Sequence, residues 1–142
     1  MTKRILSVDY GEVRTGLAVS DQLGMMAHRI GTVKTGGFKN LIAVISEKIA
    51  EYNINLIVIG NPINMNGTFG EKSETVSMLA ERIKTELNVD VVLFDERLTT
   101  ASAHEILSFT DIKSKKRKAV IDTLSAEIIL QNYLDSNRSD SK

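Results

Sequence analysis

The spacing of apolar residues predicts two kinds of element along this chain. The first third carries three short apolar runs, each ending at a turn signal: residues 5–8, 14–20 and 29–35. Because the connections between these runs are short, we predict an antiparallel meander of three strands. After residue 40 the apolar residues recur at helical spacing instead, which predicts helices that alternate with strands.

The later elements define the fold class. A run that is apolar throughout predicts a strand at 56–59, and such a strand is typical of the buried centre of a parallel sheet. A second run predicts a strand at 89–94. The helical segments are expected at about 41–52, 76–87 and 119–133, with a short one at 100–107. Apart from that short helix the order is βββαβαβα, which predicts an α/β fold: a five-stranded mixed sheet flanked by helices on both faces.

Length and composition limit the number of domains and exclude several kinds of functional site. The 142 residues suit one domain, and we expect a single domain over 1–135 followed by a polar, flexible tail over 136–142. Lys+Arg and Asp+Glu both number 18, so the zero net charge excludes a uniformly basic coat. The lack of cysteine excludes a disulfide framework and a thiolate nucleophile, and two histidines exclude a three-His metal site. No apolar run suits a secretory signal or a membrane span, so we expect a cytoplasmic protein without a membrane partner.

Acidic residues lie at the ends of two predicted strands and near the start of the last predicted helix. Asp9 ends the first strand, Asp95 and Glu96 end the last strand, and Asp122 lies near the start of the last helix. The carboxyl ends of parallel strands share one edge, where open α/β sheets bind ligands. Side chains alternate along a strand, so only one of Asp95 and Glu96 is expected to face this edge. Asp122 opens a helical stripe that is otherwise apolar or small: Ala126, Ile129 and Tyr133.

Carboxylates that converge at a buried edge repel one another unless a cation lies between them. Oxygen ligands suit Mg²⁺ or Mn²⁺, and two such ions about 4 Å apart would clamp the attacking and leaving oxygens of a phosphodiester. The alternative interpretation is structural. Asp9 would then be a turn former, Asp95 a strand-end cap and Asp122 a charge at a helix N-terminus.

A basic segment precedes Asp122. Five cations fall within six residues: Lys113, Lys115, Lys116, Arg117 and Lys118. A solvated loop would explain such a cluster, but its position beside acidic residues favours a polyanionic substrate, since Lys and Arg neutralise phosphates. Arg14 and Arg97 flank the acidic positions, and each is a candidate either to pair a carboxylate or to contact a phosphate.

The longest predicted loop runs over 60–73 and leads into a helix. Its end, Gly-Glu-Lys-Ser at 70–73, superficially resembles a P-loop, but Glu71 separates the glycine from the lysine and the required first glycine is missing. We therefore exclude nucleotide hydrolysis on that motif. Backbone groups of Asn66, Gly67 and Gly70 stay candidates for contact with a phosphate near a helix N-terminus.

Taken in order, these motifs resemble the YqgF/RuvX family over about residues 3–135. The match covers Ser-Val-Asp-Tyr-Gly at 7–11 with Arg14, Gly-Asn-Pro at 60–62, Asp-Glu-Arg-Leu-Thr-Thr at 95–100, and Lys-Arg-Lys at 116–118 followed by Asp122. The six-residue block at 95–100 is specific, whereas the opening alone also occurs in sugar-kinase and actin-like ATPases. Two departures are Asn61, where the family more often has an apolar residue, and Ser7, which replaces a common glycine.

The resemblance implies an RNase H-like fold and a divalent-metal nuclease, with Asp9, Glu96 and Asp122 as the acidic triad that ligates Mg²⁺ or Mn²⁺. Family members are described as nucleases in maturation of the 5′ end of pre-16S rRNA, and have also been proposed as Holliday junction resolvases. We therefore predict a metal-dependent nuclease acting on structured nucleic acid, either pre-rRNA or branched DNA. The ribosome or its assembly intermediates are further expected partners. Substrate backbone would be held by these cations: Arg14, Arg97, Lys115, Lys116, Arg117 and Lys118.

Three alternatives stay open. A Holliday junction resolvase must cut two strands symmetrically, which favours a homodimer over a monomer. A non-catalytic RNA-binding ribosome-assembly factor would not need the full acidic set. An actin-like ATPase closes two lobes on its nucleotide, and 142 residues supply only one. The sequence itself does not separate RNA from DNA as the substrate.

Overall fold

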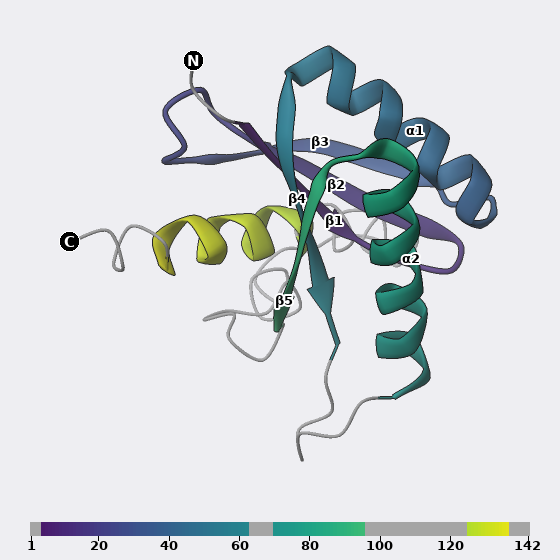
Figure 1. Ribbon diagram of the computed structural model, residues 1–142. Helices are drawn as coiled ribbons and strands as arrows, with labels where there is room; N and C mark the ends of the chain where they lie inside the picture. The colour runs from purple at the N-terminus through teal and green to yellow at the C-terminus, as the bar shows by residue number, and fades with distance from the viewer. Residues whose placement is uncertain (1–3, 63–69, 96–124, 137–142) are drawn as a thin grey trace, which may run out of the picture.

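The fold is a five-stranded mixed sheet with helices on both faces, as the sequence predicts (Figure 1). The computed structural model describes residues 4–62, 70–95 and 125–136. The strands are β1 (Arg4–Asp9), β2 (Arg14–Ser20), β3 (Ala27–Lys34), β4 (Ile54–Asn61) and β5 (Asp90–Asp95). Their order across the sheet is β3-β2-β1-β4-β5. The first three strands form the predicted antiparallel meander, and β4 and β5 extend it in parallel with β1.

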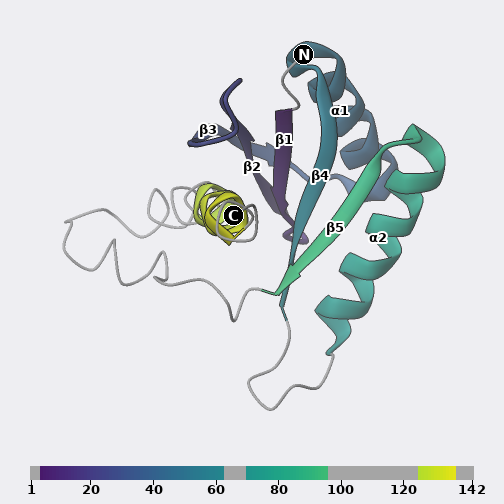
Figure 2. The same ribbon diagram turned by 60° about the vertical axis from the view of Figure 1, so that its left-hand side comes forward.

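Two helices cover one face of the sheet, and a third lies on the other (Figure 2). These are α1 (Gly37–Tyr52) and α2 (Glu71–Leu87) on the first face, and a C-terminal helix at 125–136 on the second. We call the second face the C-terminal-helix face. The predicted short helix at 100–107, the basic segment and the predicted start of the last helix lie outside the described residues. So does the predicted tail, apart from residue 136.

Alternation along the strands divides the core between the two faces. Leu6 and Val8 of β1 are fully buried in the main core beneath α1 and α2. Ile5, which alternates with them, packs against the C-terminal helix instead. The largest side chains of the main core come from the sheet and from both covering helices: Leu6, Leu17, Leu41, Ile45, Ile57, Ile59, Leu79 and Ile83. This two-sided burial explains why the centre of β4, residues 56–59, is apolar throughout, as is typical of a central parallel strand.

The C-terminal helix docks through the stripe that its sequence predicts. Ala126 is fully buried, Ile129 is 2% exposed, and the Tyr133 ring lies edge-on to Phe94 of β5 with 6.2 Å between ring centroids. A polar contact adds to this packing, because the buried Ser7 hydroxyl donates a 2.6 Å hydrogen bond to the Ala126 carbonyl. Ser7, a departure from the family pattern, therefore ties β1 directly to the helix.

Candidate active site

Three parallel strands end at the same edge of the sheet, which we call the carboxyl edge. β1 ends at Asp9, β4 at Asn61 and β5 at Asp95. The register places Val8 beside Ile59 and Asn61 beside Asp95, so the three strand ends lie in adjacent positions. Open α/β sheets bind their ligands at such an edge.

The Asp9 side chain belongs to the C-terminal-helix face. Val8 points into the core beneath α1 and α2, whereas the Ser7 hydroxyl bonds to the C-terminal helix. Asp9 lies two residues after Ser7 in the same strand, and successive side chains alternate, so it shares the face of Ser7. The carboxylate is therefore positioned at the carboxyl edge, on the side from which the C-terminal helix covers the sheet.

Asp95 lies on the opposite face from Asp9. Phe94 is buried against Ile129 of the C-terminal helix, while Val91 packs into the main core on the other side. Alternation therefore directs Asp95 toward the α2 side, in register with Asn61. The sequence allowed only one of Asp95 and Glu96 to face the edge, and Asp95 does not share the face of Asp9. Glu96 and Asp122, the other two predicted ligands, lie outside the described residues.

Arg14 lies close to Asp9 in the sheet. Asp9 pairs with Gly16 in the antiparallel register of β1 and β2, which places Arg14 two positions further along, just past the end of β1. Ala18 of the same strand packs against the C-terminal helix, so alternation gives Arg14 that face as well. The other predicted cations lie outside the described residues: Arg97, Lys115, Lys116, Arg117 and Lys118.

The turn that joins β1 to β2 is held by close backbone packing. A Cβ atom at Gly11 would collide with the carbonyl oxygen of Arg14, so only glycine fits there. The Thr35 hydroxyl donates a 2.6 Å hydrogen bond to the Gly11 carbonyl and lies 2.8 Å from the Thr15 hydroxyl. These contacts give the Asp-Tyr-Gly opening its fixed shape and connect it to the end of β3.

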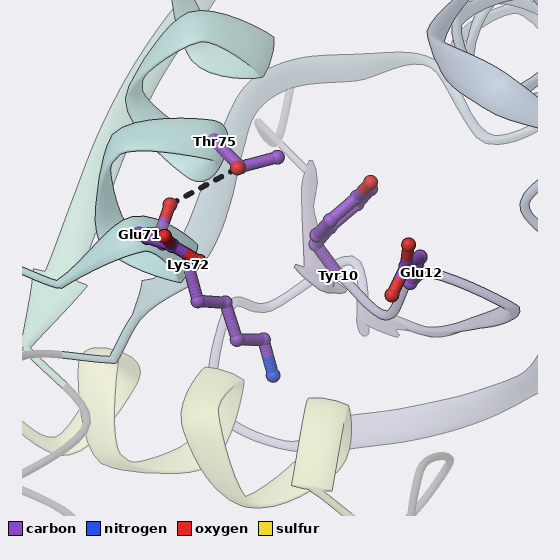
Figure 3. Close-up of a pocket in the computed structure, with 5 residues that line it drawn as sticks. All are labelled: Tyr10, Glu12, Glu71, Lys72 and Thr75. Atoms are coloured by element: carbon purple, nitrogen blue, oxygen red, sulfur yellow. Dashed lines mark hydrogen bonds between the residues drawn. The ribbon is translucent and has the colours of Figure 1, made fainter.

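A pocket of about 450 Å³ lies beside the carboxyl edge, between that turn and the start of α2 (Figure 3). Tyr10 and Glu12 line it from the turn, and Lys72 extends into it from the first turn of α2. Glu71 and Thr75 complete the lining of the pocket. The Thr75 hydroxyl donates a 3.0 Å hydrogen bond to the Glu71 carbonyl. Tyr10 and Lys72 were not among the predicted site residues, although Tyr10 directly follows Asp9 and Lys72 lies in the segment that superficially resembles a P-loop.

Gly70, one of the three predicted loop contacts, is the N-cap of α2. Its backbone is extended, and because glycine has no side chain, the N-cap residue itself supplies no side-chain acceptor to the first-turn amides. The first hydrogen bond of the helix runs from the Glu74 amide to the Gly70 carbonyl at 3.1 Å. Asn66 and Gly67, the other two predicted contacts, lie outside the described residues.

A buried polar pair fixes the start of α2 against the end of β4. The Ser73 hydroxyl donates a 2.6 Å hydrogen bond to Oδ1 of Asn61, and the two residues are 1% and 7% exposed. Asn61 departs from the apolar residue more common in the family. Its amide oxygen is satisfied here by a serine in the first turn of α2, which explains how a polar side chain is accommodated at this strand end.

We expect Ser73→Ala to lower the free energy of unfolding by about 1–3 kcal/mol, because it leaves a buried amide oxygen without its partner. Replacing both residues, as Asn61→Leu with Ser73→Ala, should cost less than the sum of the two single changes. Urea denaturation of the four proteins measures this coupling. Additive losses would show that the two side chains do not act as a pair.

Comparison with known proteins identifies the family. The family profile described as "RuvX: Holliday junction resolvase" matches residues 3–136 of the chain. The chain belongs to the RuvX family. It is 41% identical over 133 residues to a protein of Syntrophus aciditrophicus named "Putative pre-16S rRNA nuclease", covering 94% of this chain and 89% of that protein. A Clostridium tetani protein of the same name is 43% identical over 133 residues, covering 94% and 96% of the two chains.

Solved structures agree with the RNase H-like fold that the RuvX resemblance implies. RuvC of T. thermophilus, solved in complex with a Holliday junction substrate, aligns with a TM-score of 0.56 at 15% identity over 94% of this chain and 96% of its own. The fowlpox virus Holliday junction resolvase aligns with a TM-score of 0.54 at 16% identity over 94% and 99% of the two chains. At these identities the likeness establishes the shared fold.

The described residues do not contain a complete metal site. No group of three or more His, Asp or Glu side chains within 4–62, 70–95 and 125–136 could hold a metal ion. The predicted triad is thus represented in the described part of the chain by Asp9 alone. None of the helices in this part of the structure is long and apolar enough to cross a membrane.

Proposed function

We propose that this chain is a divalent-metal-dependent nuclease that hydrolyses phosphodiester bonds in structured nucleic acid, and that it matures the 5′ end of pre-16S rRNA. The observation that carries the proposal is the position of Asp9, at the end of the first of three parallel strands and on the C-terminal-helix face. It occupies this position in a chain 41–43% identical, over about 94% of its length, to proteins named for pre-16S rRNA cleavage. Such a function would place the protein in the cytoplasm, with the ribosome or its assembly intermediates as partners.

Asp9, Glu96 and Asp122 would hold the cations, Mg²⁺ or Mn²⁺ in a two-ion site. Carboxylate oxygens are the ligands that these ions prefer, and the edge position of Asp9 fits that role. The direction of Asp95, on the opposite face from Asp9, supports Glu96 as the second ligand. When bound, such ions activate water and neutralise the charge that develops at a phosphate during hydrolysis.

The protein's other contribution is to hold the substrate backbone beside the carboxylates. Without cations, an acidic edge repels a polyanion. Arg14 lies two positions beyond Gly16, the residue that pairs with Asp9, and on the same face of the sheet as Asp9. A cation at this position would offset that repulsion. In our proposal it acts with the cations of the C-terminal segment: Arg97, Lys115, Lys116, Arg117 and Lys118. Backbone groups of Asn66, Gly67 and Gly70 would add contacts from the loop before α2.

A second candidate function is the resolution of Holliday junctions, which the description of the matching family profile favours. The chemistry at each strand would be the same, and the substrate would be branched DNA. Symmetric cutting of two strands requires two active sites, so this function predicts a homodimer on the junction, whereas trimming of an RNA end is compatible with a monomer.

Cleavage of two labelled substrates side by side tests the proposal. One is an RNA with a pre-16S 5′ leader, and the other is a four-way DNA junction, each with Mg²⁺, with Mn²⁺ and with EDTA. We expect metal-dependent cleavage of the RNA. Cleavage of the junction alone would replace rRNA maturation by resolution. Binding without cleavage of either substrate, in both metals, would favour a non-catalytic assembly factor instead.

A further inference from the structure

Two cations face each other across β2 and β3. Arg14, the first residue of β2, pairs directly with Lys34, the last residue of β3. Val33 packs into the main core beneath α1 and α2, so alternation turns Lys34 to the C-terminal-helix face, as it does Arg14. The two side chains therefore leave the same face of the sheet from neighbouring positions.

Both positions lie near Asp9. The register aligns Asp9 with Gly16 and Gly16 with Thr32 in one row across three strands, and the Arg14–Lys34 pair forms the next row on the same face. From the standard strand dimensions, this row lies about 7 Å past Asp9, with Arg14 one strand away and Lys34 about 10 Å to the side. Long side chains from these two positions can reach one phosphate, or two neighbouring phosphates, of a strand that passes Asp9.

Two cationic side chains at directly opposite positions of a sheet form a place that attracts an anion. Like charges directly opposite each other in a sheet are destabilising. Arg29, on the same strand as Lys34, has its charge paired by Glu127 of the C-terminal helix at 2.7 Å. Lys34 is exposed, and within the described residues its ammonium group has no acidic partner.

The backbone beneath the pair is held in place. Asn40 of α1 donates hydrogen bonds from its side-chain amide to the carbonyls of Lys34, at 3.1 Å, and of Thr35, at 3.0 Å. The Thr35 hydroxyl bonds to the Gly11 carbonyl, and the Thr35 amide donates to the Val13 carbonyl at 2.9 Å. The ends of β2 and β3 are therefore joined to the turn after Asp9, and a site on such strands is more precisely positioned than one on a loop.

We propose that Lys34 and Arg14 form a phosphate clamp that holds the backbone of the nucleic-acid strand beside Asp9. This inference rests on the proposed function and adds a residue, Lys34, from outside the basic segment and the family motifs. Its ligand is the phosphate backbone rather than the bases, so the clamp contributes to affinity and positioning independently of sequence. The β2–β3 pair thus becomes one wall of the substrate path.

Fluorescence anisotropy with the pre-16S leader RNA, in EDTA so that no cleavage occurs, tests the clamp. Binding is measured at several salt concentrations for the wild type, Lys34→Gln and Lys39→Gln. Lys39 is an exposed cation in the first turn of α1 and serves as the matched control. We expect Lys34→Gln to weaken binding and to reduce the slope of log K against log salt by about one, the effect of one lost phosphate contact. Lys39→Gln should leave the slope unchanged, and Lys34→Arg should restore it.

The other outcomes separate the clamp from the function on which it rests. Equal slopes for Lys34→Gln and Lys39→Gln, in a protein that still binds and cleaves RNA, would overturn the clamp alone. A wild-type protein that binds neither the RNA nor the junction at any salt concentration would overturn both the clamp and the proposed function.

Discussion

Asp9→Asn should abolish nuclease activity while leaving the fold intact. The substitution keeps the size of the side chain and removes the charge with which the carboxylate would bind a divalent cation. We expect the cleavage rate to fall by at least about a hundredfold, since the loss of even one electrostatic stabiliser at an active site costs about 10²–10³. The rate of metal-dependent RNA cleavage by identically purified wild type and variant measures this.

Asp21→Asn is the matched control, because Asp21 is also a carboxylate that follows a strand. It lies at the turn between β2 and β3, at the far end of β2 from Arg14, and its carboxylate accepts a 2.9 Å hydrogen bond from the Met25 amide. That hydrogen bond lowers the pKa of Asp21 below its ordinary value. Its stabilising effect is therefore present above the pKa of the unfolded chain and is lost as the pH falls through the folded value. Full cleavage activity in Asp9→Asn, or equal losses in the two variants, would contradict the role of Asp9.

Leu130→Ala should lower the free energy of unfolding by about 2–5 kcal/mol, the range for removal of a fully buried leucine side chain. Leu130 is 0% exposed and packs with Ala18 and Ala27, and these small residues on the sheet side are too short to fill the cavity that its truncation would leave. Chemical denaturation measures the loss. The C-terminal helix is the only described element on its face, so weaker docking should also reduce activity near the unfolding transition.

Met78→Ala provides the comparison for Leu130→Ala. Met78 belongs to α2 but is 62% exposed, and its truncation should change stability by no more than about 0.5 kcal/mol. A loss below about 1 kcal/mol for Leu130→Ala would show that the C-terminal helix is not firmly docked on the sheet. The assignment of the C-terminal-helix face as the site face would then lose its support.

The sequence predicted the fold well because the decisive signals were local. The apolar run at 56–59 identified the central strand, and the stripe of Ala126, Ile129 and Tyr133 identified the buried side of the last helix. Boundaries were less exact. β3 begins at Ala27, two residues before the predicted start, and β4 extends to Asn61. The polar residues His28 and Asn61 continue these strands because their backbone pairing with the neighbouring strand outweighs their weak apolar signal.

The sequence could identify site residues only where their position along a strand decides which edge of the sheet they occupy. Asp9 could be placed at the carboxyl edge because it ends an apolar run. Alternation predicted only that one of Asp95 and Glu96 faces this edge, and the packing of Val91 and Phe94 was needed to show that Asp95 does not share the face of Asp9. Lys34 could not be identified in the same way, since its proximity to Arg14 depends on strand register. The Asn61–Ser73 hydrogen bond likewise joins residues twelve apart across a loop and a helix start, and only the packed structure brings them together.

Calorimetric titration of Mn²⁺ into the wild type and into Asp9→Asn tests most directly whether the carboxyl edge holds a catalytic cation. The account predicts saturable binding to the wild type at millimolar concentration or below, and loss of that binding in Asp9→Asn. Undetectable binding to the wild type, or equal binding to both proteins, would contradict a metal site at Asp9 and with it the nuclease mechanism.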